Sequence, residues 1–262
     1  MSSGDQVAQG MQRWAGKVAL VTGASDGIGR AIAIRLLKCG MKIIGCGRRI
    51  EALEKLKADI GGLGDLTIMQ CDVSKEEQVL AMFANIKEKF GKIDVCINNA
   101  GLGRDASILS GKSEDWQLML DTNVMGVLRV TREATSLMKA GSIAEGHIIN
   151  INSLSGHRLV PNPSGHVYTA TKFALTAITN GIRVELLTQW PDFKCRVSQI
   201  SPGLVETPFI KHHVGEEKAT QLFQQLKALE AEDLAEAVVY QLGSPPHVQI
   251  QDVLLRSIEQ TA

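Results

Sequence analysis

The sequence predicts an α/β fold, in which one doubly wound parallel sheet of about seven strands is covered by helices on both faces. Short apolar runs alternate with longer helical patterns from one end of the 262 residues to the other. No stretch rich in proline, glycine or serine is long enough to act as a linker, and no segment repeats. A single domain over residues 15–262 is therefore expected.

Seven apolar runs have the length and composition of buried strands. In chain order they are KVALVT (17–22), MKIIGC (41–46), LTIMQC (66–71), KIDVCIN (92–98), GHIININ (146–152), CRVSQI (195–200) and VQIQDVLL (248–255). Between them, apolar residues at three-to-four spacing predict helices, including 28–39, 50–60, 75–90 and 113–140. Glycine stands at two predicted helix ends, Gly40 and Gly91, where a left-handed cap is favourable.

The overall composition restricts the classes of partner and the compartment. Lysine plus arginine (28) balance aspartate plus glutamate (28), so no overall field attracts nucleic acid or an anionic membrane, and neither is expected as a partner. Five scattered cysteines without a C-x-x-C pair favour free thiols in a reducing compartment. Residues 1–14 lack the apolar core of a signal peptide and are predicted to be a flexible tail, and no run is long enough for a transmembrane helix. A cytoplasmic protein is expected.

A glycine-rich turn joins the first predicted strand to the first predicted helix. Glycines there let the backbone approach a pyrophosphate, and the following helix N-terminus offers unpaired N–H groups. The spacing G-x-x-x-G-x-G departs from the G-x-G-x-x-G dinucleotide fingerprint, and the alternative is a tight turn with a close contact between helix and sheet. The predicted cofactor contacts in this turn are Gly23, Ser25, Asp26, Gly27, Ile28 and Gly29.

Two adjacent arginines, Arg48 and Arg49, follow the second strand, where an NAD site would place an acidic residue for the ribose 2′-hydroxyl. Planar guanidinium groups suit a phosphate monoester, which favours NADP(H) as the cofactor. The alternative is that both arginines only solvate the start of a helix. Asp26 argues against NADP(H) because its carboxylate lies in the phosphate-binding turn, although it is also suited to capping the first helix.

Polar and small residues follow the third and fourth strands. Asp72 and Val73 are predicted to contact the adenine, and Asn99, Ala100 and Gly101 to admit the body of the cofactor. Each set is also compatible with a plain turn. Their position at successive carboxyl ends of one parallel sheet favours the cofactor site.

The predicted chemical centre is Ser153, at the end of the fifth strand, with Tyr168 and Lys172 fifteen and nineteen residues later. Side chains four apart project from the same face of a helix. A nearby ammonium favours the phenolate, so we expect Lys172 to lower the pKa of Tyr168 and make it a usable acid and base. An isolated Y-x-x-x-K pair is common on protein surfaces, and the serine at the preceding strand end distinguishes this one.

The motifs TGASDGIG, NNAG, Asn123, Ser153, YTATK and Pro202-Gly203 resemble, in this order and spacing, the short-chain dehydrogenase/reductase family. The resemblance covers about residues 15–256 and looks especially close to an NADP-dependent branch, through VTGASDGIG, CINNAGL, HIININSLSGHR and HVQIQDVLLR. It implies a single-domain Rossmann-type fold and hydride transfer between nicotinamide and a carbonyl or alcohol carbon.

The resemblance also implies residue roles. Ser153 would hydrogen-bond the substrate oxygen, Tyr168 would supply its proton, and Lys172 would hold the ribose and tune Tyr168. Asn123 would pass protons through water and Lys172, and the alternative for it is a helix-interior side chain bonded to its own backbone. The residues implied to cover the nicotinamide are Pro202, Gly203, Val205 and Thr207.

The expected substrate walls are residues 155–165 and the widest irregular stretch, 201–229, which is predicted to be a lid. Its apolar residues are Leu204, Val205, Phe209, Ile210, Val214, Leu222 and Phe223. They favour an apolar carbonyl or alcohol, such as a steroid, a farnesol-like prenyl alcohol or aldehyde, or a xenobiotic ketone. The histidines do not reproduce a metal-ligand spacing, so no metal is expected.

Surplus apolar positions on the helices 113–140 and 166–188 predict a homodimer or homotetramer. They include Leu118, Leu128, Ala177 and Leu186. Two rival functions stay open. One is a cofactor-binding sensor or scaffold without turnover, and the other is the same fold running an epimerisation or a dehydration.

Overall fold

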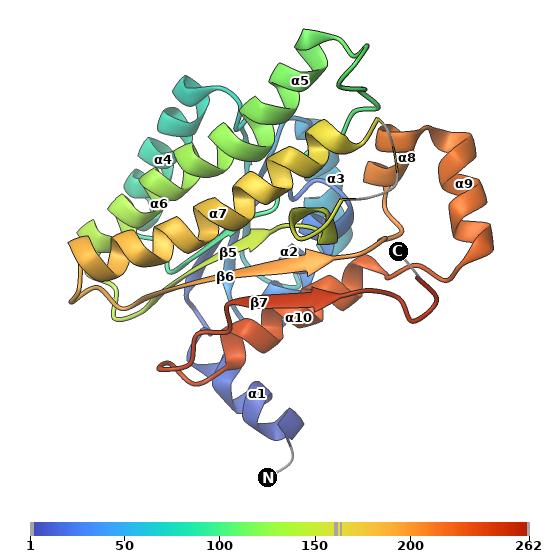
Figure 1. The fold of residues 1–262 in the computed structure, drawn as a ribbon. Coiled ribbons are helices and arrows are strands. Elements are labelled where there is room, and N and C mark those ends of the chain that lie inside the picture. Colours follow the sequence, from blue (N-terminus) through green and yellow to red (C-terminus); the bar gives the residue numbers. More distant parts are fainter. Residues whose placement is uncertain (1–2, 160–161, 163, 261–262) are drawn as a thin grey trace.

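A computed structural model describes residues 3–159, 162 and 164–260, and a seven-stranded parallel sheet runs through its centre in the order β3-β2-β1-β4-β5-β6-β7 (Figure 1). All seven predicted strands are confirmed. Their bounds are β1 Val18–Thr22, β2 Lys42–Gly47, β3 Leu66–Gln70, β4 Val95–Asn98, β5 Gly146–Ile151, β6 Cys195–Pro202 and β7 Asp252–Leu255. Chain order reverses between β1 and β4, and this reversal is where an open α/β sheet has its ligand crevice.

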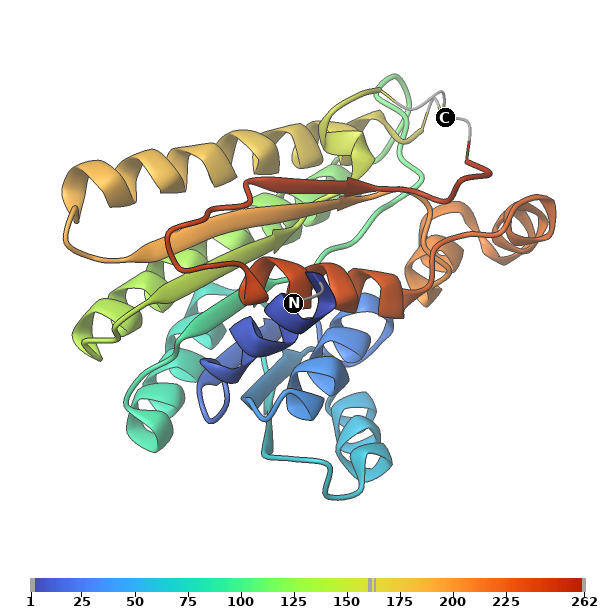
Figure 2. The same cartoon turned by 90° about the horizontal axis from the view of Figure 1, so that it is seen from below.

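Helices cover both faces of the sheet, as predicted (Figures 1 and 2). One face carries α1 (Ser3–Gln12), α2 (Gly27–Lys38), α3 (Ile50–Ile60) and α10 (Ala231–Gly243). The other carries α4 (Glu76–Phe90), α5 (Ser113–Leu120), α6 (Val127–Ala140) and α7 (His166–Gln189). Because both faces are covered, β1, β4 and β5 are buried along their whole length, which explains why apolar residues predominate in them.

Glycine caps end the helices where the sequence predicts them. Gly40 and Gly91 adopt φ values of 78° and 68°, a left-handed backbone conformation that residues other than glycine rarely adopt. The chain can therefore turn back into the sheet directly after α2 and α4.

The N-terminal segment differs from the prediction of a flexible tail, because residues 3–12 form α1. Met11 and Trp14 are buried in the core shared with α10, and the Trp14 indole donates a hydrogen bond to the Leu242 carbonyl at 2.9 Å. Gly10 lies so close to Gly243 that a Cβ would be 1.9 Å from its carbonyl oxygen. Burial of two large apolar side chains, rather than helix propensity, orders this segment.

The stretch 201–229 is also more regular than predicted. β6 continues to Pro202, and two short helices follow, α8 (Pro208–Val214) and α9 (Glu216–Gln225), joined by Gly215. Figure 1 shows both beyond the carboxyl ends of the strands. The sequence did not predict these helices, because they are too short to give a clear periodic pattern of apolar residues.

The long helix predicted over 113–140 contains a π-helical segment, η1 (Asp121–Gly126), between α5 and α6. Such segments are rare and frequently mark functional sites, because one extra residue rotates the side chains that follow. η1 contains Asn123.

No helix within the described ranges is long and apolar enough to cross a membrane. All five cysteines are free thiols. Cys46, Cys71 and Cys96 are buried as their strand positions suggest, whereas Cys39 and Cys195 are partly exposed.

Candidate active site

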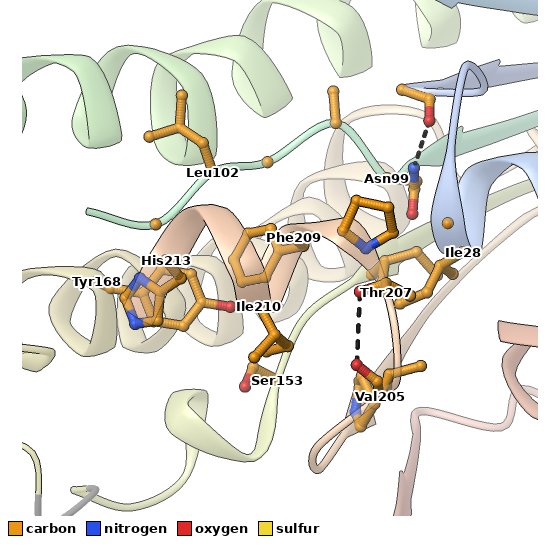
Figure 3. A pocket seen from close by; sticks show the side chains of 18 of the residues that line it. Ile28, Asn99, Leu102, Ser153, Tyr168, Val205, Thr207, Phe209, Ile210 and His213 are labelled. Atoms are coloured by element: carbon orange, nitrogen blue, oxygen red, sulfur yellow. Dashed lines mark hydrogen bonds between the residues drawn. The ribbon is translucent and has the colours of Figure 1, made fainter. Parts of the chain in front are cut away.

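One cavity of about 760 Å³ opens at the carboxyl ends of the strands. It extends from the turn between β1 and α2 to α7 and α8, so residues far apart in the sequence share its wall (Figure 3). Nearly all of the predicted cofactor contacts line it. They are Gly23, Ser25, Asp26, Gly27, Ile28, Arg48, Arg49, Asp72, Val73, Asn99, Ala100, Gly101, Tyr168, Lys172, Pro202, Gly203, Val205 and Thr207.

The glycine turn is built for close approach of backbone to a ligand. Gly23 and Gly27 have φ values of 66° and 49°, which favour glycine at both positions. Gly29 does not line the cavity. A Cβ there would lie 2.3 Å from the Gly23 carbonyl oxygen, so Gly29 serves the packing of α2 against the turn. Asp26 caps α2 by accepting a hydrogen bond from the Gly27 amide at 2.8 Å, which is the capping role that the sequence left open.

Asn99 fixes this turn from the neighbouring strand. Its amide nitrogen donates to the carbonyls of Thr22 and Gly23, at 2.9 and 3.1 Å. The Thr22 hydroxyl accepts from the amides of Asn99 and Ala100, both at 3.0 Å. The loop after β4 and the glycine turn therefore form one rigid unit.

The two arginines have different surroundings. Arg49 donates to the Ser25 hydroxyl at 3.4 Å and pairs with the Asp26 carboxylate at 3.3 Å. The Arg48 side chain is exposed and has no hydrogen-bond or ion-pair partner among the residues that the structure describes. Asp26 therefore holds one guanidinium at the rim of the cavity and leaves the other available.

Asp72 forms a turn beside the cavity, where its carboxylate accepts from the Ser74 amide at 3.0 Å. Val73 is buried against Gly126 of η1, where a Cβ would lie only 2.8 Å from its methyl group. Both the turn role and the place on the cavity wall are thus observed for this pair.

Tyr168 and Ser153 meet at the other end of the cavity. Tyr168 lies near the start of α7 and is only 9% exposed, and Ser153 lies directly before a short 3-10 helix, η2 (Leu154–Gly156). Burial raises the pKa of Tyr168 to about 12, and the hydrogen bond with Ser153 acts in the opposite direction. The expected lowering of this pKa by Lys172 is therefore wrong, because desolvation of the buried phenol has the largest effect on it.

Lys172 lies one turn after Tyr168, with its ammonium 5.7 Å from the centre of the phenol ring. The ammonium donates to the Ile151 carbonyl at 3.0 Å and has no carboxylate partner among the described residues. Burial lowers the pKa of Lys172 from 10.5 to about 8. A buried amine next to a buried phenol is typical of functional sites.

Asn123 lies behind the cavity wall rather than on it. Its side chain accepts from the Leu102 amide at 2.9 Å and donates to the Leu102 carbonyl at 2.8 Å and to the Thr171 hydroxyl at 3.0 Å. These contacts exclude the alternative in which Asn123 bonds its own helix backbone. Instead, η1 turns Asn123 toward α7 and ties the loop after β4 to the helix that carries Tyr168 and Lys172.

Helix α8 closes the end of the cavity next to Tyr168 (Figure 3). The ring centres of Phe209 and His213 lie 5.8 and 5.2 Å from that of Tyr168. His213 also lies against Gly103, where a Cβ would be 2.1 Å from its Nδ1. Burial lowers the pKa of His213, against the opposing effects of the Asp105 carboxylate and the Gly103 carbonyl. These contacts make α8 a wall of the substrate end.

Several of the apolar residues in the predicted lid line the cavity. Leu204, Phe209, Ile210 and Leu222 line the cavity, but Phe223 does not, because α9 turns it away from the lining face. The side chain of Val214 lies outside the described part of the chain. In the other predicted wall, Ser155, Arg158 and Asn162 line the cavity, and residues 160, 161 and 163 lie outside the described residues.

Sequence reasoning missed several lining residues that come from unexpected segments. Gln260, near the C-terminus, reaches the wall and accepts from the Leu204 amide at 2.9 Å. No local sequence motif predicts such a contact. Others are Leu102, Gly103, Arg104, Thr122, Asn152 and Leu226. Across the described ranges, no three histidine, cysteine, aspartate or glutamate side chains come close enough to hold a metal ion.

The cavity suits a dinucleotide carrying a phosphate on its adenosine ribose. The glycine turn and the start of α2 can hold a pyrophosphate, and the guanidinium groups at the end of β2 can hold a further phosphate. The opposite end carries a hydroxyl, a phenol and an ammonium, which can bind an oxygen atom and move a proton to or from it.

Comparisons with known proteins agree with this geometry. Residues 17–219 match the sequence model of the short chain dehydrogenase family. The chain is 50% identical to Dehydrogenase/reductase SDR family member 11 of Gallus gallus over 255 residues, covering 95% of this chain and 99% of the relative. It is 42% identical to the farnesol dehydrogenase of Aedes aegypti over 253 residues, covering 95% and 98%. The closed form of a serine dehydrogenase complexed with NADP+ has the same fold, with a TM-score of 0.83, 35% identity and coverage of 94% and 96%.

Proposed function

Because this chain belongs to the short-chain dehydrogenase/reductase family, and so is an oxidoreductase of that family, we propose that it is an NADP(H)-dependent alcohol dehydrogenase or carbonyl reductase. The observation that carries the proposal is a single cavity with Ser153, Tyr168 and Lys172 at one end and a glycine turn with two arginines at the other. A nicotinamide bound between these ends would supply hydride to a carbonyl carbon or accept it from an alcohol carbon.

The proposed chemistry of the side chains is acid–base catalysis at one oxygen atom. Ser153 hydrogen-bonds the substrate oxygen, and Tyr168 gives that oxygen a proton during reduction and takes it back during oxidation. Lys172 binds the ribose hydroxyls, and its charge, 5.7 Å from the phenol ring, favours the phenolate when Tyr168 gives up its proton. Asn123 fixes the loop after β4 against α7 through Leu102 and Thr171.

The exposed guanidinium groups support NADP(H) over NAD(H), and the serine dehydrogenase of the same fold was solved with NADP+. Arg48, without a side-chain partner in the described ranges, and Arg49, held by Asp26, are proposed to bind the 2′-phosphate. Asp72 and Val73 are proposed to contact the adenine. Because Asp26 already neutralises Arg49, Arg48 should contribute more of the phosphate affinity.

Replacing Arg48 by alanine should weaken NADPH binding roughly tenfold to a hundredfold and leave NADH binding nearly unchanged, because the lost contact is a charge-assisted hydrogen bond to a phosphate. Arg49→Ala should have a smaller effect. Fluorescence titration of both cofactors measures this. Equal losses for NADPH and NADH would show that the arginines support the fold rather than bind the phosphate.

The proposed substrate is an apolar carbonyl compound or alcohol, such as a steroid, a farnesol-like isoprenoid or a xenobiotic ketone. Support comes from the apolar side chains in the cavity wall, and from the farnesol dehydrogenase name of one relative. These side chains are Leu102, Leu154, Leu204, Phe209, Ile210 and Leu222.

Phe209→Ala should raise KM for a bulky apolar substrate about tenfold or more while NADPH affinity stays the same, because the ring lies beside that of Tyr168, where the substrate is proposed to bind. Phe223→Ala is the matched control, since this phenylalanine lies on the neighbouring helix and outside the cavity wall. Steady-state kinetics with a prenyl and a short-chain alcohol measure the difference. The same response in both variants would remove Phe209 from substrate selection.

The decisive experiment is NADPH oxidation against a panel of steroid, prenyl and aromatic ketones and aldehydes, with the reverse reaction measured on the alcohols. A member that is consumed in step with NADPH supports the proposal. Tight NADPH binding without turnover of any member would favour a cofactor-binding sensor or scaffold. Turnover without net oxidation or reduction would indicate an epimerase or a dehydratase.

A homo-oligomer is proposed from the apolar side chains exposed on η1, α6 and α7. Leu128 on α6 is 38% exposed, and Val184 and Leu187 on α7 are 60% and 71% exposed. Leu186, which the sequence assigned to this surface, is buried in the core, because it points toward the sheet. Isologous pairing would cover these side chains around a two-fold axis.

Sedimentation should therefore give a dimer or tetramer of the 28.3 kDa chain, and the double variant Val184→Glu, Leu187→Glu should dissociate it. Leu63→Glu is the control, since Leu63 is 43% exposed but lies after α3, away from this surface. A monomeric parent protein at micromolar concentration would contradict the prediction.

A further inference from the structure

A polar cluster lies directly behind the turn that carries Ser153. Four side chains form it: His157 from the end of η2, Gln199 and Ser201 from β6, and Asp252 from β7. None of the four lines the cavity, so the proposed chemistry does not use them. His157 and Asp252 lie in HIININSLSGHR and HVQIQDVLLR, two segments that are distant in the sequence.

The Asp252 carboxylate is the acceptor at the centre of this cluster. Its Oδ2 accepts from Gln199 Nε2 at 2.7 Å and lies 3.0 Å from His157 Nε2. Its Oδ1 accepts from the Ser201 hydroxyl at 2.9 Å. His157 Nε2 also lies 3.0 Å from the Ser201 hydroxyl. A single histidine nitrogen thus joins η2 to β6 and to the edge strand β7.

The opposite side of η2 packs closely against α7. A Cβ on Gly156 would lie 2.8 Å from the Lys172 carbonyl oxygen and 2.7 Å from the Asn152 amide nitrogen. Within the turn, the Ser155 amide donates to the Ser153 hydroxyl at 3.1 Å and the His157 amide to the Leu154 carbonyl at 3.0 Å. These bonds connect His157 to Ser153 within one short turn.

We propose that His157 and Asp252 are positioning residues that hold η2 between β7 and α7, so that the Ser153 hydroxyl stays against the phenol of Tyr168. This inference rests on the proposed function of Ser153 and Tyr168 and adds a requirement to it. The two catalytic groups sit on different elements, and packing against α7 alone fixes η2 from one side. The contact through Asp252 fixes it from the other.

Titratable and charged groups lie near both His157 and Tyr168. Asp252 of β7 faces His157, and Arg183 of α7 lies near enough to Asp252 to interact with its charge. Around Tyr168, the titratable side chains are Lys172 on α7 and His213 on α8. Loss of the hydrogen bond from Ser153 would raise the pKa of Tyr168, because this bond is what opposes the effect of burial.

The test compares His157→Ala with His157→Gln in the full chain. The alanine variant should lower kcat roughly tenfold to a hundredfold, with little change in KM or in NADP+ affinity. The pH profile of alcohol oxidation should move upward by about one pH unit, because Tyr168 loses the bond that favours its phenolate. The glutamine variant places an amide nitrogen where Nε2 was. It should restore most of kcat and return the pH profile close to that of the parent protein.

Gln249→Ala is the matched control. Gln249 lies just before β7 and accepts from the Val197 amide of β6 at 2.9 Å, so its bond also joins this part of the chain to β6. It should leave kcat and the pH profile unchanged. In a double-mutant cycle, His157→Ala and Asp252→Ala should be non-additive in kcat, because each removes the contact between His157 and Asp252. Additive effects, or equal pH profiles in all variants, would overturn the proposal.

Amide hydrogen exchange tests the inference without using activity. The amides of residues 155–158 should exchange about tenfold faster in ligand-free His157→Ala than in the parent protein, and Gln249→Ala should not change them. Unchanged exchange would overturn the inference even if the parent enzyme turns over ketones. Faster exchange with an inactive parent would instead refute the proposed function and leave the mechanical coupling in place.

Discussion

Tyr168→Phe is expected to bind NADPH with nearly unchanged affinity and to lose turnover by about 10²–10⁴-fold, the range typical of removing a general acid. The substitution removes a single oxygen atom from a ring that is 9% exposed. The ring keeps its contacts with Phe209 and His213, so the fold and the wall of the cavity stay intact. The effect should therefore appear in kcat rather than in stability or in cofactor binding.

The chain contains a natural control for this experiment. Its only other tyrosine, Tyr240, lies on α10 and is 50% exposed. Tyr240→Phe should leave turnover unchanged. Parent-like kcat in Tyr168→Phe would remove Tyr168 from the mechanism, and unchanged NADPH binding in the same sample would show that the result does not come from misfolding.

Most of the fold could be predicted from local sequence, because each strand and most helices have a recognisable pattern of apolar residues. The runs that became β1, β4 and β5 are rich in apolar residues because helices bury both of their faces. The segments that differ from the prediction depend on distant partners. α1 is ordered by burial of Trp14 against α10, a contact between the two ends of the chain.

The candidate site divides in the same way. Motifs at strand ends were predictable, because parallel strands bring their carboxyl ends to one edge of the sheet. Gln260 and the cluster around Asp252 were not, since side chains from the last strand and tail reach the site only through tertiary packing. The pKa of Tyr168 is raised rather than lowered, and this too depends on tertiary packing. Spacing on a helix shows which charge is near, but not how much water the fold excludes.

Lys172→Met is expected to separate stability from activity, because it removes a buried charge that the ligand-free fold does not pair with a carboxylate within the described ranges. The pKa of Lys172 falls from 10.5 to about 8 on burial. Below pH 8 the lysine is protonated in both the folded and the unfolded chain, and the folded state carries the full desolvation cost of about 3 kcal/mol. Between pH 8 and 10.5 the unfolded chain binds more protons than the folded one, so this cost disappears as the pH rises.

The methionine variant should therefore be about 1–3 kcal/mol more stable than the parent protein at pH 7, the lower value allowing for the lost hydrogen bond to the Ile151 carbonyl. This difference should shrink toward zero as the pH approaches 10.5. Urea unfolding of both proteins at several pH values measures it. The thiols of Cys96 and Cys195, whose pKa values burial raises, affect both proteins equally and cancel. Turnover should fall about 10²-fold or more in the same variant, since the group proposed to hold the ribose and favour the phenolate is gone. A variant that is both less stable at pH 7 and fully active would show that Lys172 serves the fold through its bond to β5 and has no part in the chemistry.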